Sequence, residues 1–100
     1  MKKISFIAAI ALIFAVTVFA QERKLKVSSF NVRNDNSGDA NAGNGWKNRY
    51  PVMVNMIRFH DLDIIGTQEC KANQIDDLNN SLPNYSYVGV GRADGNRGDE

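Results

Sequence analysis

Beyond residue 20 the hydrophobic positions follow two different periods, which predict that strands and helices alternate. Apolar and polar residues alternate over Leu25–Arg33, and this period of two predicts a strand. The segment Asn34–Gly45 is rich in Asn, Asp and Gly and has no apolar residue other than Ala, so it predicts a loop. A helix capped by Asn48, with Pro51 in its first turn, should follow. Its apolar face has the spacing i, i+3, i+4, i+7, formed by Tyr50, Met53, Val54 and Ile57.

The second half of the chain predicts three further elements. Leu62–Gly66 is a short apolar run that suits a strand buried on both faces. A helix should cover Asn73–Ser81, because Ile75, Leu78 and Leu82 share one face and Pro83 follows. Tyr85–Val90 predicts a third strand, and a polar, glycine-bearing loop should run from Gly91 to Glu100. The resulting order of strand, loop, helix, strand, helix and strand indicates the α/β class.

The first 20 residues have the pattern of a cleavable export signal. Two lysines follow Met1, the run Ile4–Phe19 is almost wholly apolar, and Val18 and Ala20 place small residues before a cut at Gln21. The run is shorter than the roughly 20 residues that a membrane-spanning helix needs, so cleavage is favoured over anchoring. We therefore expect a signal peptide over residues 1–20 and a mature chain, without a stable membrane span, in the bacterial periplasm or outside the cell.

Charge and cysteine content exclude two classes of protein for the mature part. The first 20 residues hold two of the 12 basic residues and none of the 11 acidic ones, so residues 21–100 carry a formal net charge of −1. A protein that coats nucleic acid without sequence preference needs a basic surface instead. The single cysteine cannot form a disulfide within the chain. Because the chain ends in polar residues soon after a strand-like run, we expect residues 21–100 to be the first part of a longer domain.

Polar side chains stand where the predicted strands end. Asn31 lies near the end of the first strand, and Glu69 directly follows the apolar second strand. The third strand is followed by a further set of charged residues: Arg92, Asp94, Asp99 and Glu100. Ligands bind at the carboxyl ends of strands in open α/β sheets, and a carboxylate there suits a hard cation such as Mg²⁺. The alternative for Glu69 is an ordinary surface or helix-capping residue.

Other conspicuous residues favour structural roles. His60, the only histidine, stands at the predicted end of the first helix, where its charge complements the helix dipole. Cys70 is expected to act as a small hydrophobic residue, and Trp46 to anchor a loop against the core. Arg49 could pair with Asp or phosphate, and an ordinary surface ion pair is an equal alternative. The pattern Asp35–Asn41 resembles a Ca²⁺ loop but has Ala40 where the turn needs Gly.

Four blocks of the chain, in order and spacing, resemble the endonuclease/exonuclease/phosphatase superfamily, and the resemblance extends from Leu25 to Glu100. They are Ser29–Arg33, Trp46-x-x-Arg49, His60–Glu69 and Tyr87–Gly95. This superfamily comprises Mg²⁺-dependent phosphodiesterases and phosphomonoesterases, among them DNase I-like nucleases, sphingomyelinases and inositol polyphosphate phosphatases. The sequence is most similar to its secreted bacterial branch.

The resemblance implies a four-layer α/β/β/α sandwich, in which two mixed sheets pack face to face with helices outside. It implies that Glu69 is the principal ligand of Mg²⁺, with Mn²⁺ as an alternative ion, and that Asn31 lies beside the metal and the scissile phosphate. Glu100, or Asp99 in the rival register, would orient a catalytic histidine. Arg92 would be a structural or phosphate-facing residue. The family's catalytic His, its Asp-x-Asn pair and its C-terminal Asp-His all lie beyond residue 100.

The expected activity is therefore that of an exported, monomeric phosphoesterase in which water attacks phosphorus in line with the leaving group. Small phosphodiesters, phospholipid headgroups, sugar phosphates and nucleic acids all remain candidate substrates, although the near-neutral charge gives little support to long duplex DNA. The alternative is a non-catalytic extracellular binding module that keeps the fold with a decayed site.

Overall fold

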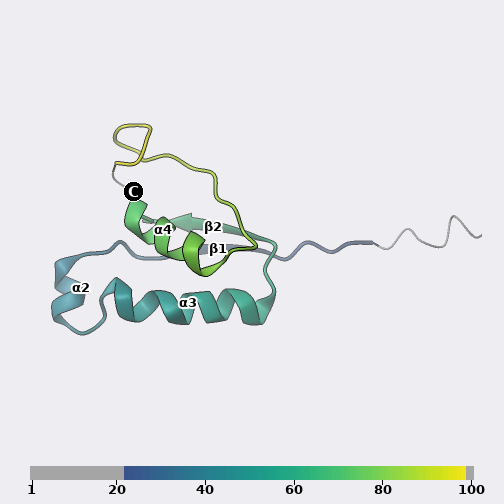
Figure 1. Ribbon diagram of the computed structural model, residues 1–100, viewed down its shortest axis with the longest axis horizontal. Coiled ribbons are helices and arrows are strands. Elements are labelled where there is room, and N and C mark those ends of the chain that lie inside the picture. Colours follow the sequence, from purple (N-terminus) through teal and green to yellow (C-terminus); the bar gives the residue numbers. More distant parts are fainter. Residues whose placement is uncertain (1–21, 99–100) are drawn as a thin grey trace, which may run out of the picture.

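The computed structural model describes residues 22–98, so the predicted signal peptide and both Asp99 and Glu100 lie outside the described part of the chain. Five elements follow one another along it, as Figure 1 shows: β1 (Val27–Asn31), α2 (Ser37–Asn41), α3 (Trp46–His60), β2 (Ile64–Gln68) and α4 (Ala72–Ser81). The two strands are parallel neighbours, and α3 forms the connection between them. None of the described helices is both long and apolar enough to cross a membrane.

The register of the two strands decides where the candidate residues fall. Val27 pairs with Ile64 at one end of the sheet, and Asn31 pairs with Gln68 at the other. β1 lies within the predicted strand, but β2 begins two residues later than predicted. The reason is that Leu62 takes part in the cap that ends α3, since its N–H donates to the Ile57 carbonyl at 3.4 Å. The prediction that this strand is buried on both faces is wrong, since alternate residues of β2 are exposed.

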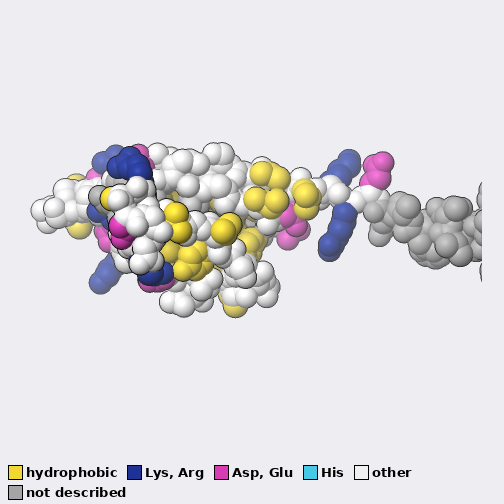
Figure 2. Space-filling view, turned by 90° about the horizontal axis from the view of Figure 1, so that it is seen from above, with side chains coloured by type: hydrophobic (Ala, Val, Ile, Leu, Met, Phe, Trp, Pro, Cys, Tyr) yellow, Lys and Arg dark blue, Asp and Glu magenta, His cyan; other side chains and the backbone are white. Residues whose placement is uncertain are grey.

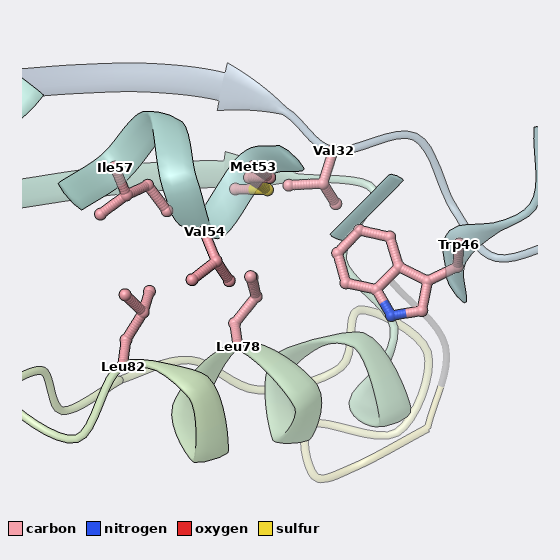
Figure 3. Close-up of a cluster of buried hydrophobic side chains, with 7 residues drawn as sticks. All are labelled: Val32, Trp46, Met53, Val54, Ile57, Leu78 and Leu82. Carbon is pink, nitrogen blue, oxygen red and sulfur yellow. The ribbon is translucent and has the colours of Figure 1, made fainter. Parts of the chain in front are cut away.

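The hydrophobic core lies between one face of the sheet and the two longer helices. Figure 3 shows how α3 and α4 face each other across it, with side chains pointing inward from both. The buried set consists of Val32, Trp46, Met53, Val54, Ile57, Leu78 and Leu82. Each such side chain stabilises the fold by about 1.5–3 kcal/mol relative to an exposed one. The predicted face of α3 is therefore the one that packs, and on α4 Leu78 and Leu82 pack as predicted, whereas Ile75 lies outside the core cluster.

The segment between β1 and α3 contains a short helix that the loop prediction missed. Its cap is Asn36, whose side-chain oxygen accepts a hydrogen bond from the Asp39 N–H at 2.8 Å. The prediction that Asn48 caps the next helix is also wrong. Gly45 is the N-cap, and its carbonyl accepts from the Asn48 N–H at 3.0 Å. Pro51 consequently lies beyond the first turn of α3.

The predicted third strand does not form in the described structure. Among the described residues, no backbone hydrogen bond joins 86–90 to β2. The Tyr85 hydroxyl anchors the start of this segment by donating to the Leu62 carbonyl. Farther along, the chain turns back on itself, because Gly91 N–H donates to the Asn96 carbonyl at 2.7 Å. The segment thus passes β2 without pairing, and Val88 is fully exposed.

Candidate functional site

Asn31 and Glu69 lie in contact at the carboxyl-terminal edge of the sheet. Because Asn31 is paired with Gln68 across the parallel strands, Glu69 is the first residue beyond the same edge. The Asn31 amide Nδ2 donates a hydrogen bond to Glu69 Oε1 at 2.9 Å. The structure therefore brings together the two residues that the sequence singled out at the ends of the first two strands.

The backbone at Glu69 adopts the left-handed conformation, with φ of 57°. This conformation costs an L-residue about 1–2 kcal/mol, so it is unusual for glutamate. It ends β2 and places the carboxylate near the loop after β1, where Oε2 accepts from the Asn34 N–H at 3.3 Å. The hydrogen bonds from the Asn31 side chain and then from Asn34 hold the pKa of Glu69 below its ordinary value, and the charge of Arg33 acts in the same direction.

The loop after β1 also orients the Asn31 amide. The Arg33 N–H donates to Asn31 Oδ1 at 2.8 Å, so the amide oxygen points to the loop and the NH₂ group to Glu69. Arg33 likewise has a left-handed backbone, with φ of 55°. The Arg33 side chain pairs with Asp39 of α2, and its Nη2 donates to Asp39 Oδ1 at 2.8 Å.

A cavity of about 540 Å³ opens beside Glu69, between the end of β2, the start of α4 and residues 87–98. Arg97 lines this cavity, whereas Arg92 is not among its lining residues. The structural or phosphate-facing role expected of Arg92 stays a prediction. The Arg97 guanidinium is already engaged, since Nη2 contacts Asp76 Oδ2 at 2.6 Å and Nη1 donates to the Tyr87 hydroxyl at 3.0 Å. The role predicted for Glu100, or for Asp99, concerns residues outside the described part of the chain.

In the described part of the chain, the residues expected to be structural form no hydrogen bond with Asn31 or Glu69. His60 ends α3 beside the start of β1, where its carbonyl accepts from Lys26 Nζ at 3.3 Å, at the opposite end of the strands from Glu69. Trp46 is buried, and its Nε1 donates to Asp77 Oδ2 at 2.8 Å. Cys70 is half-buried, and burial raises the pKa of its thiol, which is the wrong direction for a nucleophile.

Two features of the loop after β1 differ from expectation. Arg49 was expected to bind an acid or phosphate, but its guanidinium instead donates to backbone carbonyls, among them that of Val32 at 2.5 Å. The segment that resembled a Ca²⁺ loop includes α2, and Asp39 there pairs with Arg33. Across residues 22–98 no three His, Cys, Asp or Glu side chains gather into a metal-binding group.

Gln74 is the polar residue that sequence reasoning missed. Among the described residues, Gln74 is the one polar residue that is buried, and its exposed fraction is 0%. A signal was present, because Gln74, Leu78 and Leu82 follow at intervals of four and thus share one helix face. A glutamine in line with core leucines must find hydrogen-bond partners inside the protein.

The donor set at Glu69 fits a hard divalent cation. Mg²⁺ is commonly held by one or two carboxylates, with water and substrate phosphate completing its octahedron, so a cluster of three acids is not required. Each Glu69 oxygen accepts one hydrogen bond from the protein, from Asn31 and Asn34 respectively, and a carboxylate oxygen has a second lone pair. Glu69 is therefore suited to be the protein's carboxylate ligand, whereas the Asn31 amide is already used to orient it.

Taken together, parallel strands linked through a helix, with a polar pair at their carboxyl edge, define an α/β protein of the type that binds ligands at that edge.

No family model and no curated protein matches the chain. Solved structures do match it, among them three from Bacteroides. A mannosyl-6-phosphatase of Bacteroides thetaiotaomicron is 49% identical over 76% of this chain, with a TM-score of 0.74. An endonuclease/exonuclease/phosphatase family protein of the same organism is 48% identical over 79%, with a TM-score of 0.77.

A third match, the endonuclease/exonuclease/phosphatase of Bacteroides vulgatus, is 42% identical over 69% of this chain, with a TM-score of 0.64. The chain belongs to the endonuclease/exonuclease/phosphatase family, and its fold is that of the DNase I-like proteins. It spans 28%, 29% and 26% of the three matched chains. The described residues form one helical layer and one sheet layer of the predicted four-layer sandwich.

Proposed function

We propose that this chain is part of an exported, metal-dependent hydrolase of phosphoester bonds. The observation that carries the proposal is the Asn31–Glu69 pair at the carboxyl edge of the parallel strands, in a chain 42–49% identical to phosphatase-family structures. A sugar phosphate is the substrate class we favour. One matched structure is a mannosyl-6-phosphatase, and the near-neutral charge of residues 21–100 does not suit a long duplex.

In this proposal Glu69 holds the divalent ion, Mg²⁺ or alternatively Mn²⁺, together with water. The ion, when bound, polarises the phosphoryl oxygen and neutralises the charge that develops on it. Asn31 fixes the direction of Glu69 Oε1, and the Asn34 N–H fixes that of Oε2. Asn31 adds no negative charge, so it does not repel the phosphate as a second carboxylate would. Water then attacks phosphorus in line, and the leaving oxygen departs on the opposite side.

The test is the substitution Glu69→Gln in the full-length protein, assayed on mannose 6-phosphate and bis-p-nitrophenyl phosphate with Mg²⁺ and Mn²⁺. We expect kcat to fall by at least about 100-fold, because even the loss of an outer partner of a metal ligand costs 10–100-fold. Asp61→Asn is the matched control. Asp61 also has a left-handed backbone, with φ of 51°, and it lies at the other end of the strands from Glu69.

Full activity of Glu69→Gln would refute the assignment of Glu69 as the ligand. A wild-type protein that binds Mn²⁺ but hydrolyses neither substrate would instead favour the non-catalytic binding module. An Asp61→Asn variant that loses as much activity as Glu69→Gln would show that the charge change, rather than the position, matters.

The export step is a separate part of the proposal. We expect cleavage between Ala20 and Gln21, because small residues occupy the two positions that signal peptidase reads. Mass spectrometry of protein recovered from the periplasm or medium should then give an N-terminus at Gln21. Protein that remains in the membrane fraction with residues 1–20 attached would contradict cleavage and favour the anchor.

A further inference from the structure

The backbone of residues 32–35, which we call the bracing loop, directs two of its N–H groups toward the Asn31–Glu69 pair. The Arg33 N–H donates to Asn31 Oδ1 at 2.8 Å, and the Asn34 N–H donates to Glu69 Oε2 at 3.3 Å. The Val32 N–H extends the sheet by donating to the Gln68 carbonyl at 3.0 Å. The position of this loop therefore determines how both members of the Asn31–Glu69 pair are oriented.

Arg49 holds the carbonyl side of the bracing loop. From the first turn of α3, Nη1 donates to the Val32 carbonyl at 2.5 Å, and Nη2 donates to the Arg33 carbonyl at 3.1 Å and the Asn34 carbonyl at 3.4 Å. Nε donates to the Asn44 carbonyl at 2.9 Å. A planar guanidinium with several fixed donors spans neighbouring carbonyls in a way that a lysine ammonium cannot.

Gln74 holds the same loop from α4. Its Oε1 accepts from the Asp35 N–H at 3.0 Å and from the Lys71 N–H at 3.1 Å, while Nε2 donates to the Arg33 carbonyl at 3.0 Å. Lys71 Nζ completes the set by donating to the Asp35 carbonyl at 3.0 Å. Every N–H and every carbonyl from Val32 to Asp35 thus has a partner, and Gln74 is fully buried while it supplies two of them.

We propose that Arg49 and Gln74 are positioning residues of the phosphoester site. Neither forms a hydrogen bond with Asn31 or Glu69 in the described structure, but both bind the loop whose N–H groups orient that pair. Of the four residues of the bracing loop, Val32 alone is apolar, so packing alone does not fix the loop, and its hydrogen bonds to α3 and α4 supply the remaining restraint. The catalytic consequence rests on the proposed function, whereas the restraint on the loop and on Glu69 does not.

The experiment compares Gln74→Glu, Gln74→Met and Arg49→Lys with the core variant Leu78→Ala in the full-length protein. Gln74→Glu keeps the acceptor and loses the donor to the Arg33 carbonyl, whereas Gln74→Met loses all three hydrogen bonds at similar volume. Leu78→Ala removes a buried side chain from the same helix but removes no hydrogen bond to the loop. It is the control for a loss of stability alone.

We expect kcat at saturating metal to fall about 10-fold in Gln74→Glu and about 100-fold in Gln74→Met, as for other outer partners of metal ligands, with KM changed less than about 3-fold. Mn²⁺ affinity, measured directly by calorimetry, should fall about 10-fold in both. Hydrogen exchange of the peptide that covers 32–35 should accelerate in all three loop variants. Leu78→Ala should lower Tm while it leaves kcat and Mn²⁺ affinity near wild type.

Unchanged exchange at 32–35 in Gln74→Glu and Arg49→Lys would overturn the proposal, and so would a Leu78→Ala variant with the same loss of kcat and Mn²⁺ affinity. If Gln74→Met does not fold, the other two loop variants decide the outcome. If the wild-type protein has no hydrolytic activity, the proposed function fails. Exchange and Mn²⁺ affinity then still report whether Arg49 and Gln74 position the loop and Glu69.

Discussion

Three non-glycine residues of the described chain have left-handed backbones: Glu69 of the candidate site, Arg33 of the loop beside it, and Asp61 at the other end of the strands. Non-glycine residues are held in this conformation only where the surrounding structure compensates for the strain. At Glu69 the compensation is the pair of hydrogen bonds from Asn31 and Asn34. The backbone is thus strained at the residue whose carboxylate is best placed to bind a cation.

This strain predicts an inverted order of stability at position 69. Glu69→Gly should be more stable than Glu69→Ala by about 1 kcal/mol, because glycine adopts positive φ without a steric cost and both variants lose the same hydrogen bonds. Denaturant unfolding of the full-length variants measures the difference. The control position is Gln68, the preceding residue in β2. There Gln68→Gly should be less stable than Gln68→Ala, because glycine weakens the interior of a strand. Equal stability of the two position-69 variants would contradict a strained backbone there.

At the scale of elements, α2 is held against the end of β1 by the pair between Arg33 and Asp39. The hydrogen bond from Arg33 lowers the pKa of Asp39 from 3.8 to about 2, and Asn36 and Arg49 contribute in the same direction. A folded-state pKa below the unfolded value means that the ionised carboxylate stabilises the fold. That contribution is complete above about pH 4 and is lost as the pH falls toward 2.

Asp39→Asn should therefore be less stable than wild type at pH 7, and the difference should shrink between pH 4 and 2. Denaturant unfolding of both proteins at several pH values measures it. Because the pair is at the surface, the difference at pH 7 should also diminish in high salt. A difference that stays constant down to pH 2 would show that the Asp39 charge does not act through this pair.

The elements that the sequence predicts well are those whose signal is local. α4 follows its apolar spacing to within a residue of the predicted start, and β1 lies inside its predicted strand. The missed helix α2 depends on a cap at Asn36 and on an ion pair with Arg33, neither of which apolar spacing reveals. The third strand was predicted from composition, but a strand also needs a hydrogen-bonded neighbour, and Tyr85–Val90 has none among the described residues.

The candidate site likewise has residues whose position the sequence predicts and residues whose role it does not. The positions of Asn31 and Glu69 were predictable because Asn31 ends one strand, Glu69 follows the next, and parallel strands end at one edge. The roles of Arg49 and Gln74 were not, because the loop atoms that they bind lie 15–17 and 39–41 positions away along the chain. Such hydrogen bonds exist only once α3 and α4 have packed on the sheet.

At the scale of the whole molecule, the elements of residues 22–98 leave one face of the two-stranded sheet exposed. Val27 and its partner Ile64 are 65% and 52% exposed, and Figure 2 shows several hydrophobic side chains open on the surface. Two strands with one covered face are marginally stable at best, and parallel sheets normally have both faces covered. The part of each matched structure that aligns with this chain is less than one third of that structure.

Residues 21–100 expressed alone should therefore show no cooperative thermal transition and should bind a hydrophobic dye such as ANS. Circular dichroism during heating, together with dye fluorescence, tests this expectation. The double variant Val27→Thr, Ile64→Thr is the matched control, since it keeps β-branched residues while it makes the open face more polar, and it should bind less dye. A sharp transition in the unmodified fragment would contradict the prediction.

The left-handed backbone at Glu69 also bears on how such a site is lost over evolutionary time. A single base change converts either glutamate codon to a glycine codon, and glycine is the residue that this backbone accommodates most readily. Purifying selection on folding therefore gives little protection to the carboxylate, since most selection of that kind removes only variants below a stability threshold. A lineage that no longer needs to hydrolyse phosphoesters would therefore lose Glu69 early while it keeps the fold. Inactive proteins of this fold would then arise easily, and the presence of Glu69 would mark those that retain activity.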